Sequence, residues 1–122
     1  MSYIRNGRCA VRSYIFANSD IEGFIDLLGG ETIEKHPTQD GHHLSVAIGD
    51  AVMVIEAGDS FPVPTNVSYV YVYVPDVDAV YSALLAYGAK SVSAPEDKPY
   101  EERQCGVEDS FGNTWWISTF TG

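Results

Sequence analysis

The stretch from Val67 to Val74 reads Val-Ser-Tyr-Val-Tyr-Val-Tyr-Val and alternates between two kinds of side chain. Alternation with a period of two predicts a β-strand whose faces meet different surroundings. The valine face suits a hydrophobic core. The other face, with Tyr69, Tyr71 and Tyr73, suits either the wall of a cavity that offers hydrogen-bonding groups or a half-exposed sheet face. The neighbouring segments have to separate these two interpretations.

Length and composition are those of one globular domain. The 122 residues are 45% hydrophobic and 20% charged, and a chain of this size can bury a core without disulfides. We therefore expect residues 1–122 to form a single domain. The apolar runs are too short to span a bilayer, and the first residues lack the apolar core of a signal peptide. A cytoplasmic protein with no membrane partner is expected.

Acidic residues dominate the charge. Seventeen acidic and seven basic residues give a net charge of −10, which repels phosphate backbones, so we expect no nucleic-acid partner. The same field attracts cations, including cationic small molecules; alternatively, it serves only solubility. Cys9 and Cys105 are too few for a disulfide scaffold, and inert thiols are expected at both.

Residues 9–56 predict one strand, one helix and three further strands. Ser19 followed by Glu22 has the spacing of a capping box, and Gly29-Gly30 ends the helix. Gly49-Asp50 joins the last two strands as a hairpin. The predicted strands are 9–17, 31–36, 43–48 and 51–56.

Residues 67–120 repeat this order. Asp76 is a good N-cap for a helix, Gly88 closes it, and Gly112-Asn113 forms the hairpin turn. A proline-marked loop is expected at 94–101. The predicted strands are 67–74, 90–93, 103–108 and 114–120.

Corresponding positions in the two halves lie about sixty residues apart, which indicates an internal repeat. Each half is a βαβββ module, module one at about 9–56 and module two at about 67–120, and residues 57–66 connect them. The fold class is α+β. One helix can cover only one face of each sheet, so the other face must be buried against a second module or a ligand. Two curved mixed sheets would form a cup.

Several motifs carry a resemblance to a known superfamily. They are Tyr-Val-Tyr-Val-Pro-Asp-Val-Asp-Ala-Val-Tyr at 71–81, Ala-Tyr-Gly-Ala at 86–89, Ala-Pro-Glu-Asp-Lys-Pro-Tyr at 94–100, Gly-Val-Glu-Asp-Ser-Phe-Gly-Asn-Thr-Trp-Trp-Ile-Ser-Thr at 106–119 and Asp-Gly-His-His-Leu-Ser-Val-Ala-Ile-Gly-Asp-Ala-Val-Met at 40–53. The chain resembles the vicinal oxygen chelate superfamily of glyoxalase I, extradiol dioxygenases and bleomycin and fosfomycin resistance proteins. The PhnB-like branch is the most similar. This resemblance implies the cup-shaped fold and a homodimer.

Metalloenzymes of this superfamily take ligands from the first and fourth strands of each module. In module two these positions fall on Tyr69 and Trp116, and in module one the first falls on Ser13 or Ala10, depending on the alignment. Only Glu56 is a usual ligand, and a catalytic metal commonly needs three protein donors. We therefore expect no metal and no cofactor.

His42 and His43 are adjacent on a strand, so they point to opposite faces and cannot bind one ion together. For His43 three roles stay open: a polar contact in the cavity, a surface or packing histidine, or a metal ligand. Arg103 is expected either to contact an anion at the rim or to pair with Glu101, Glu102 or Glu108.

Aromatic side chains thus replace charged ones at the floor of the expected cup. Strand parity puts Tyr69, Tyr71, Tyr73 and Trp116 on one pocket wall, with Glu56 at its edge. Aromatic faces attract cations by about 0.5–2 kcal/mol per contact. The expected guest is planar, aromatic or cationic.

These observations favour a metal-independent small-molecule-binding protein without catalytic activity, which sequesters an aromatic or cationic compound as bleomycin-resistance proteins do. The first alternative is a lyase or dioxygenase that uses a divalent metal on His43 and Glu56. The second is a scaffold whose cup is filled by its own side chains.

Overall fold

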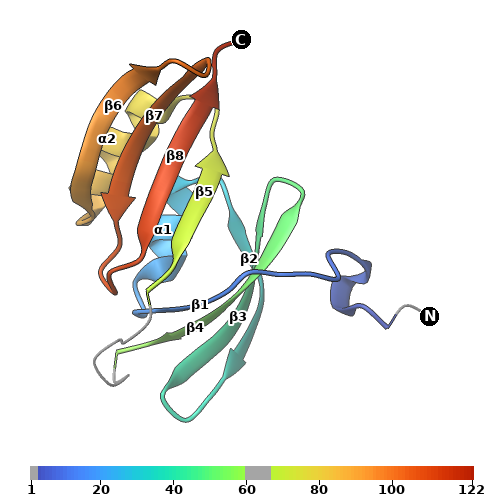
Figure 1. Ribbon diagram of the computed structural model, residues 1–122. Coiled ribbons are helices and arrows are strands. Elements are labelled where there is room, and N and C mark those ends of the chain that lie inside the picture. The colour runs from blue at the N-terminus through green and yellow to red at the C-terminus, as the bar shows by residue number, and fades with distance from the viewer. Residues whose placement is uncertain (1–2, 60–66) are drawn as a thin grey trace.

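Two four-stranded mixed sheets form the protein, in a computed structural model that describes residues 3–59 and 67–122 (Figure 1). Sheet A has the strand order β1-β4-β3-β2 and sheet B the order β5-β8-β7-β6. Module one contains β1 (Tyr14–Ala17), α1 (Ile21–Leu27), β2 (Glu31–Pro37), β3 (Gly41–Ile48) and β4 (Ala51–Gly58). Module two contains β5 (Tyr69–Tyr73), α2 (Val77–Tyr87), β6 (Lys90–Lys98), β7 (Glu102–Glu108) and β8 (Thr114–Phe120).

Both modules have the same topology, so the predicted α+β fold of two βαβββ modules is confirmed. In each module the first strand pairs in parallel with the last, and the other neighbours are antiparallel. Within the described ranges, no helix is long and apolar enough to cross a membrane.

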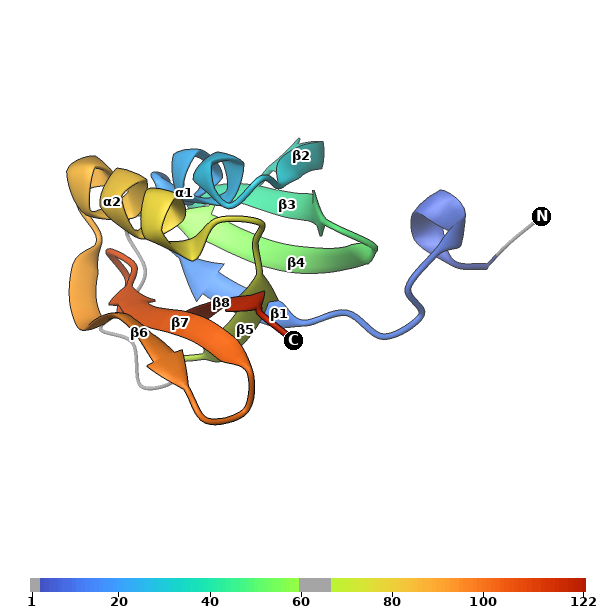
Figure 2. The ribbon, with the colours of Figure 1, turned by 90° about the horizontal axis from the view of Figure 1, so that it is seen from above.

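One hydrophobic core joins the modules. Helix α1 lies beside α2 (Figure 2), and Phe24 of α1 contacts Trp115 of β8, with ring centroids 5.1 Å apart. We call the sheet faces that contribute to this core the inner faces. Their fully buried side chains include Ile15, Leu44, Ile55, Val107, Trp115 and Ile117. The valine side of β5 belongs to this core, as the alternation predicts, with Val72 6% exposed.

A polar network at the turn before β8 also connects the two modules. Asp109, which is buried, accepts hydrogen bonds from Asn113 Nδ2 at 2.9 Å and Trp115 Nε1 at 3.0 Å. Asn113 Nδ2 also donates to the carbonyl of Phe16 at 2.8 Å, and its Oδ1 accepts from the amide of Ser68 at 2.9 Å. Asn113 therefore connects the starts of β5 and β8 to the end of β1.

The first strand is shorter than predicted. The sequence pattern predicts a strand over residues 9–17, but β1 begins at Tyr14 and a short 3-10 turn, η1 (Arg5–Gly7), precedes it. Cys9 has φ +62°, and the Arg12 guanidinium donates to the carbonyls of Cys9 and Arg8 at 3.1 and 3.0 Å. Residues 8–13 are therefore irregular, and the ladder with β4 begins only at Tyr14.

The predicted capping box at Ser19 is wrong. The N-cap of α1 is Asp20, with no side-chain cap hydrogen bond. Ser19 Oγ instead donates to Asp59 Oδ2 at 2.6 Å, while Glu22 accepts from Lys35 at 2.8 Å. Tertiary partners thus displace the local capping contacts. In α2 the prediction holds, because Asp76 Oδ1 accepts from the amide of Ala79 at 3.1 Å.

Two segments of module two also differ from the prediction. The loop expected at 94–101 is strand as far as Lys98, because β6 is an edge strand and tolerates Pro95 at a bulged register. The strand expected over 67–74 is ordered as β5 only over Tyr69–Tyr73. Of the predicted connector, residues 60–66 lie outside the described residues.

Candidate ligand-binding face

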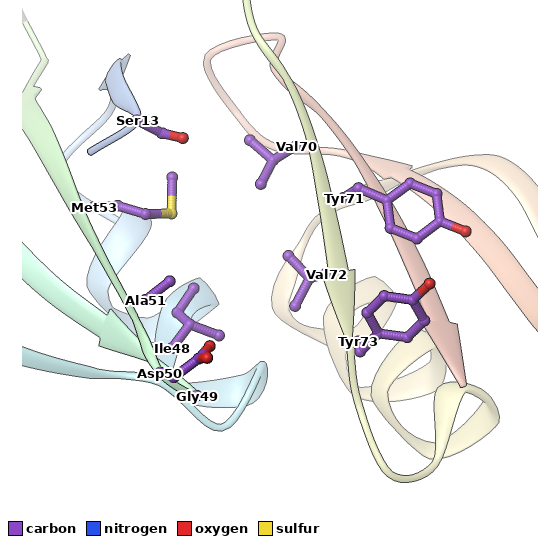
Figure 3. A pocket seen from close by; sticks show the side chains of 10 residues that line it. All are labelled: Ser13, Ile48, Gly49, Asp50, Ala51, Met53, Val70, Tyr71, Val72 and Tyr73. Carbon is purple, nitrogen blue, oxygen red and sulfur yellow. The ribbon is translucent and has the colours of Figure 1, made fainter. Parts of the chain in front are cut away.

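The three tyrosines of β5 lie on the outer face of sheet B. Figure 3 shows Tyr71 and Tyr73 pointing away from sheet A, whereas Val70 and Val72 point towards Met53. The exposed fractions of Tyr69, Tyr71 and Tyr73 are 74%, 49% and 58%. In the single chain the rings are therefore open to a partner.

A carboxylate that is 8% exposed lies beneath two of these rings. Glu102, the first residue of β7, accepts a hydrogen bond from the hydroxyl of Tyr73 at 2.6 Å and another from the hydroxyl of Tyr71. The two rings lie 5.5 Å apart with an interplanar angle of 55°. The hydroxyls converge on one anion while parts of the ring surfaces stay accessible.

Gln104, Ser118 and Tyr100 form further hydrogen bonds that orient this arrangement. Gln104 Nε2 donates to the Tyr71 oxygen at 2.7 Å and to Ser118 Oγ at 2.8 Å. Gln104 Oε1 accepts from the hydroxyl of Tyr100 at 3.0 Å. Because Gln104 occupies the Tyr71 oxygen as a donor, the Tyr71 proton points to Glu102.

The hydrogen bonds of this network shift the pKa values of Glu102, Tyr71 and Tyr73. Hydrogen bonds from Tyr71 and Tyr73 hold the pKa of Glu102 below its usual range. The bond to Glu102, with desolvation, raises the pKa of Tyr73 to about 12. Desolvation, followed by the bond to Glu102, raises the pKa of Tyr71. Neutral phenols and an ionised carboxylate are therefore the stable state at neutral pH.

Trp116 completes this surface, which we call the tyrosine face. It pairs with Tyr71 on one side and with Gly106 on the other. A β-carbon at Gly106 would overlap the Trp116 ring, so the missing side chain lets the indole lie flat on β7. The tyrosine face consists of Tyr69, Tyr71, Tyr73, Glu102, Gln104, Gly106, Thr114, Trp116 and Ser118.

Sheet A has its own polar and aromatic cluster on its outer face. Nδ1 of His43 is hydrogen bonded to Glu56, its cross-strand partner. Tyr14 and Phe16 lie next to them on β1, with ring centroids 5.6 Å apart. Desolvation, and then the nearby Glu56 carboxylate, raises the pKa of Tyr14.

The residues singled out from the sequence thus form two groups on different sheets. Tyr69, Tyr71, Tyr73 and Trp116 come together on sheet B. His43 and Glu56 come together on sheet A, on the face opposite to the one that Met53 presents to β5. One chain does not bring Glu56 to the tyrosine face.

Arg103 belongs to neither group. It lies on the helix side of β7, where its guanidinium binds Asp78 at 2.7 and 3.0 Å and Asp97 at 3.3 Å. Ion pairing is the role that the structure gives it, although the expected partners were glutamates. The charge of Arg103 is therefore directed away from the tyrosine face.

A groove of about 310 Å³ separates the inner faces of the two sheets beside β5 (Figure 3). Ile48 and Met53 of module one face Val70 and Val72 across it. The groove lies on the valine side of β5. Its lining is mainly apolar and also includes Ser13, Asp50 and parts of Tyr71 and Tyr73, whose rings point to the other side of the strand.

The side chains do not fit the metal site that the superfamily implies. Of the four expected ligand positions, only Glu56 has a usual ligand, and its neighbour His43 brings the donors to two. Among residues 3–59 and 67–122 no three His, Cys, Asp or Glu side chains lie close enough to hold a metal ion together. We derive no metal chemistry from this arrangement.

Residues 21–117 match the model of the Glyoxalase/Bleomycin resistance protein/Dioxygenase superfamily. The fold and this match define the class, and the chain belongs to that superfamily. Comparison with curated proteins gives no significant match.

Solved structures share the fold. TioX from Micromonospora sp. ML1 is 22% identical, with a TM-score of 0.65 over 91% of this chain and 99% of its own. TnmS3, an antibiotic binding protein from Streptomyces sp. CB03234, is 21% identical, with a TM-score of 0.64 over 92% and 98%. The hypothetical protein SA1046 from S. aureus is 13% identical, with a TM-score of 0.70 over 92% and 94%. At these identities the likeness concerns the fold.

Sequence reasoning missed Glu102 and Gln104 as members of the site. Both alternate with Arg103 and Cys105 along β7, so parity could have put them on the face opposite to the core. The register of β7 on β8 and of β8 on β5 was needed to bring them to Tyr71 and Tyr73.

Proposed function

We propose that the protein is a metal-independent small-molecule-binding protein that holds an aromatic or cationic compound on the tyrosine face and sequesters it. The observation that carries this proposal is a set of aromatic rings, 49–74% exposed on β5, above a fully hydrogen-bonded polar network. Rings that are held from below and open above offer stacking surface with little loss of side-chain freedom. The antibiotic-binding description of TnmS3, which has the same fold, supports a binding role.

The unit that binds is proposed to be a homodimer. The outer faces of both sheets carry exposed aromatic rings. On sheet A these are Tyr14 and Phe16, which are 55% and 43% exposed. In one chain these faces do not meet, but a second copy could lay its sheet A face over the tyrosine face. Such a pairing would bring His43 and Glu56 to the same cavity as Tyr71 and Trp116. By two-fold symmetry it would form two equal sites.

The finer assignment to the PhnB-like branch rests on the motifs at 71–81 and 106–119, and a cytoplasmic location stays a prediction from the sequence.

Titration with a panel of planar compounds that includes cationic, neutral and anionic members tests this function. Of the two tryptophans, Trp115 is buried and Trp116 is half-buried on the tyrosine face, so binding should quench the fluorescence of Trp116. The quenching should disappear in Trp116→Phe. No binding by any member of the panel would contradict the proposal.

Matched tyrosine variants locate the site. Tyr69→Ala should weaken binding by about twofold to tenfold, since an aromatic contact contributes about 0.5–1.5 kcal/mol. Tyr3→Ala removes a tyrosine that is 95% exposed on the segment before β1, and it should leave the affinity unchanged. Equal effects of the two variants would exclude the tyrosine face as the site.

A further inference from the structure

Glu102 is a buried anion without a cationic partner. Among the described residues it takes part in no ion pair. Lys98 is directly opposite Glu102 on β6, but the Lys98 ammonium is bound to Glu96. Arg103, the next residue along β7, pairs with Asp78 and Asp97. Among the described residues, the charge of Glu102 is therefore balanced by hydroxyl hydrogen bonds, mainly from Tyr71 and Tyr73 with a smaller contribution from Ser118.

Those hydrogen bonds transmit the charge to the ring surfaces. A phenol that donates to a carboxylate is polarised towards phenolate, because linked hydrogen bonds strengthen one another. Its ring becomes richer in electrons, and an electron-rich face attracts a cation more strongly. Tyr71 and Tyr73 both donate to Glu102, so both exposed rings are polarised in the same direction.

We propose that Glu102 makes the Tyr71–Tyr73 ring pair a receptor for a positively charged nitrogen, so that the ligands of the tyrosine face are cations such as ammonium or quaternary ammonium compounds. This inference rests on the proposed binding function and names its ligand class. The cation would lie over the two ring faces, with Glu102 behind them as the counter-charge. Glu102, on sheet B, takes the role that the sequence had suggested for Glu56.

Choline and its uncharged isostere 3,3-dimethylbutan-1-ol are suitable probes, because they differ in charge and share a shape. Binding to the full chain can be followed by the NMR signal of the Trp116 indole. The wild-type protein should bind choline on the order of tenfold more tightly than the alcohol. In Glu102→Gln that preference should disappear, because choline binding weakens when the counter-charge is removed.

Two further variants test whether the choline preference comes from net charge in general or from the hydrogen bond between Tyr73 and Glu102. Glu101→Gln removes a charge from the adjacent, exposed residue and should keep the preference, so a general effect of net charge would show there. Tyr73→Phe keeps the ring but removes its hydrogen bond to Glu102, and it should reduce the preference for choline in part. Thermal unfolding of each variant checks that the fold is intact.

The outcomes separate the two proposals. Equal affinities for choline and the alcohol, or no choline binding by a protein that binds uncharged planar compounds, would overturn the inference and leave the binding function standing. A choline preference that survives in a folded Glu102→Gln protein would also overturn it. No binding of either probe or of any compound in the planar panel would instead reject the binding function itself.

Discussion

The Trp116 indole lies directly on Gly106, its cross-strand neighbour, at a distance that leaves no room for a β-carbon. A side chain on β7 at this point would lift the indole away from the sheet. The flat position of one ring in the tyrosine face therefore depends on the absence of a side chain on the neighbouring strand.

Gly106→Ala should displace Trp116 and weaken ligand binding about tenfold, with a loss of stability of about 1–3 kcal/mol from overpacking. Ligand titration and chemical denaturation measure the two effects. Gly23→Ala is the matched control, because its β-carbon would meet Tyr87. Neither residue belongs to the tyrosine face, so binding should persist. Unchanged binding by Gly106→Ala would show that the Trp116 position is unimportant.

The titration of Tyr73 should be unusual. Its folded-state pKa is about 12, above the ordinary tyrosine value of 10.0, so its contribution to stability is complete below pH 10 and is lost as the pH rises towards 12. Ultraviolet absorbance of the phenolate should show late-titrating tyrosines that ionise nearer their ordinary pKa in Glu102→Gln. An identical titration curve for the variant would contradict the hydrogen bond.

The pKa of Glu102 is shifted in the opposite direction to that of Tyr73. Its folded-state pKa is lowered by Tyr71 and Tyr73, so its stabilising effect is present above its unfolded pKa and is lost as the pH falls through the folded value. Wild-type protein should lose more stability than Glu102→Gln between neutral and acid pH. Denaturation curves measured across that range test this, and parallel curves would speak against it.

Asp109→Ala should lower the free energy of unfolding by about 2–4 kcal/mol, because it leaves buried donors of Asn113 and Trp115 without an acceptor. Urea denaturation measures the change. Glu108→Ala, a half-buried neighbour, should cost clearly less. If both variants were equally stable, the hydrogen bonds of Asp109 would not contribute to the contact between the modules.

Association of two chains should depend on the aromatic residues of β1. Phe16→Ser is expected to raise the dimer dissociation constant at least about tenfold, through loss of an apolar contact of roughly 1.5–3 kcal/mol. Sedimentation over a dilution series gives the constant. Val92→Ser, at a residue 48% exposed on β6, should leave it unchanged. A wild-type protein that is monomeric at every concentration would refute the dimer.

Removal of divalent metals should not change ligand affinity. The reason is that His43 and Glu56 provide only two donors, whereas a catalytic site commonly uses three. Titration before and after treatment with a chelator checks this. Stoichiometric zinc, nickel, manganese or iron in protein purified without a chelator would favour the lyase or dioxygenase alternative.

Much of the fold could be read from the sequence because its signals are local. The alternation of Val70 and Tyr71 separates core from surface, Asp76 and Gly88 mark the ends of a helix, and the repeated order of segments predicts two modules. Where side-chain contacts compete with the predicted local structure the sequence misleads, as when Ser19 binds Asp59 and Arg12 binds the carbonyls of Arg8 and Cys9 before β1.

The candidate site also has one part that local motifs predict and another that depends on long-range contacts. The motifs close by in the chain were enough to predict that Tyr69 and Trp116 stand at positions where the resemblance implies metal ligands. That Glu102 lies under Tyr71 and Tyr73, and that His43 and Glu56 belong to another face, depends on the three-dimensional arrangement of the strands. Strand register and the packing of one sheet on another are long-range properties, and local patterns along the chain do not specify them.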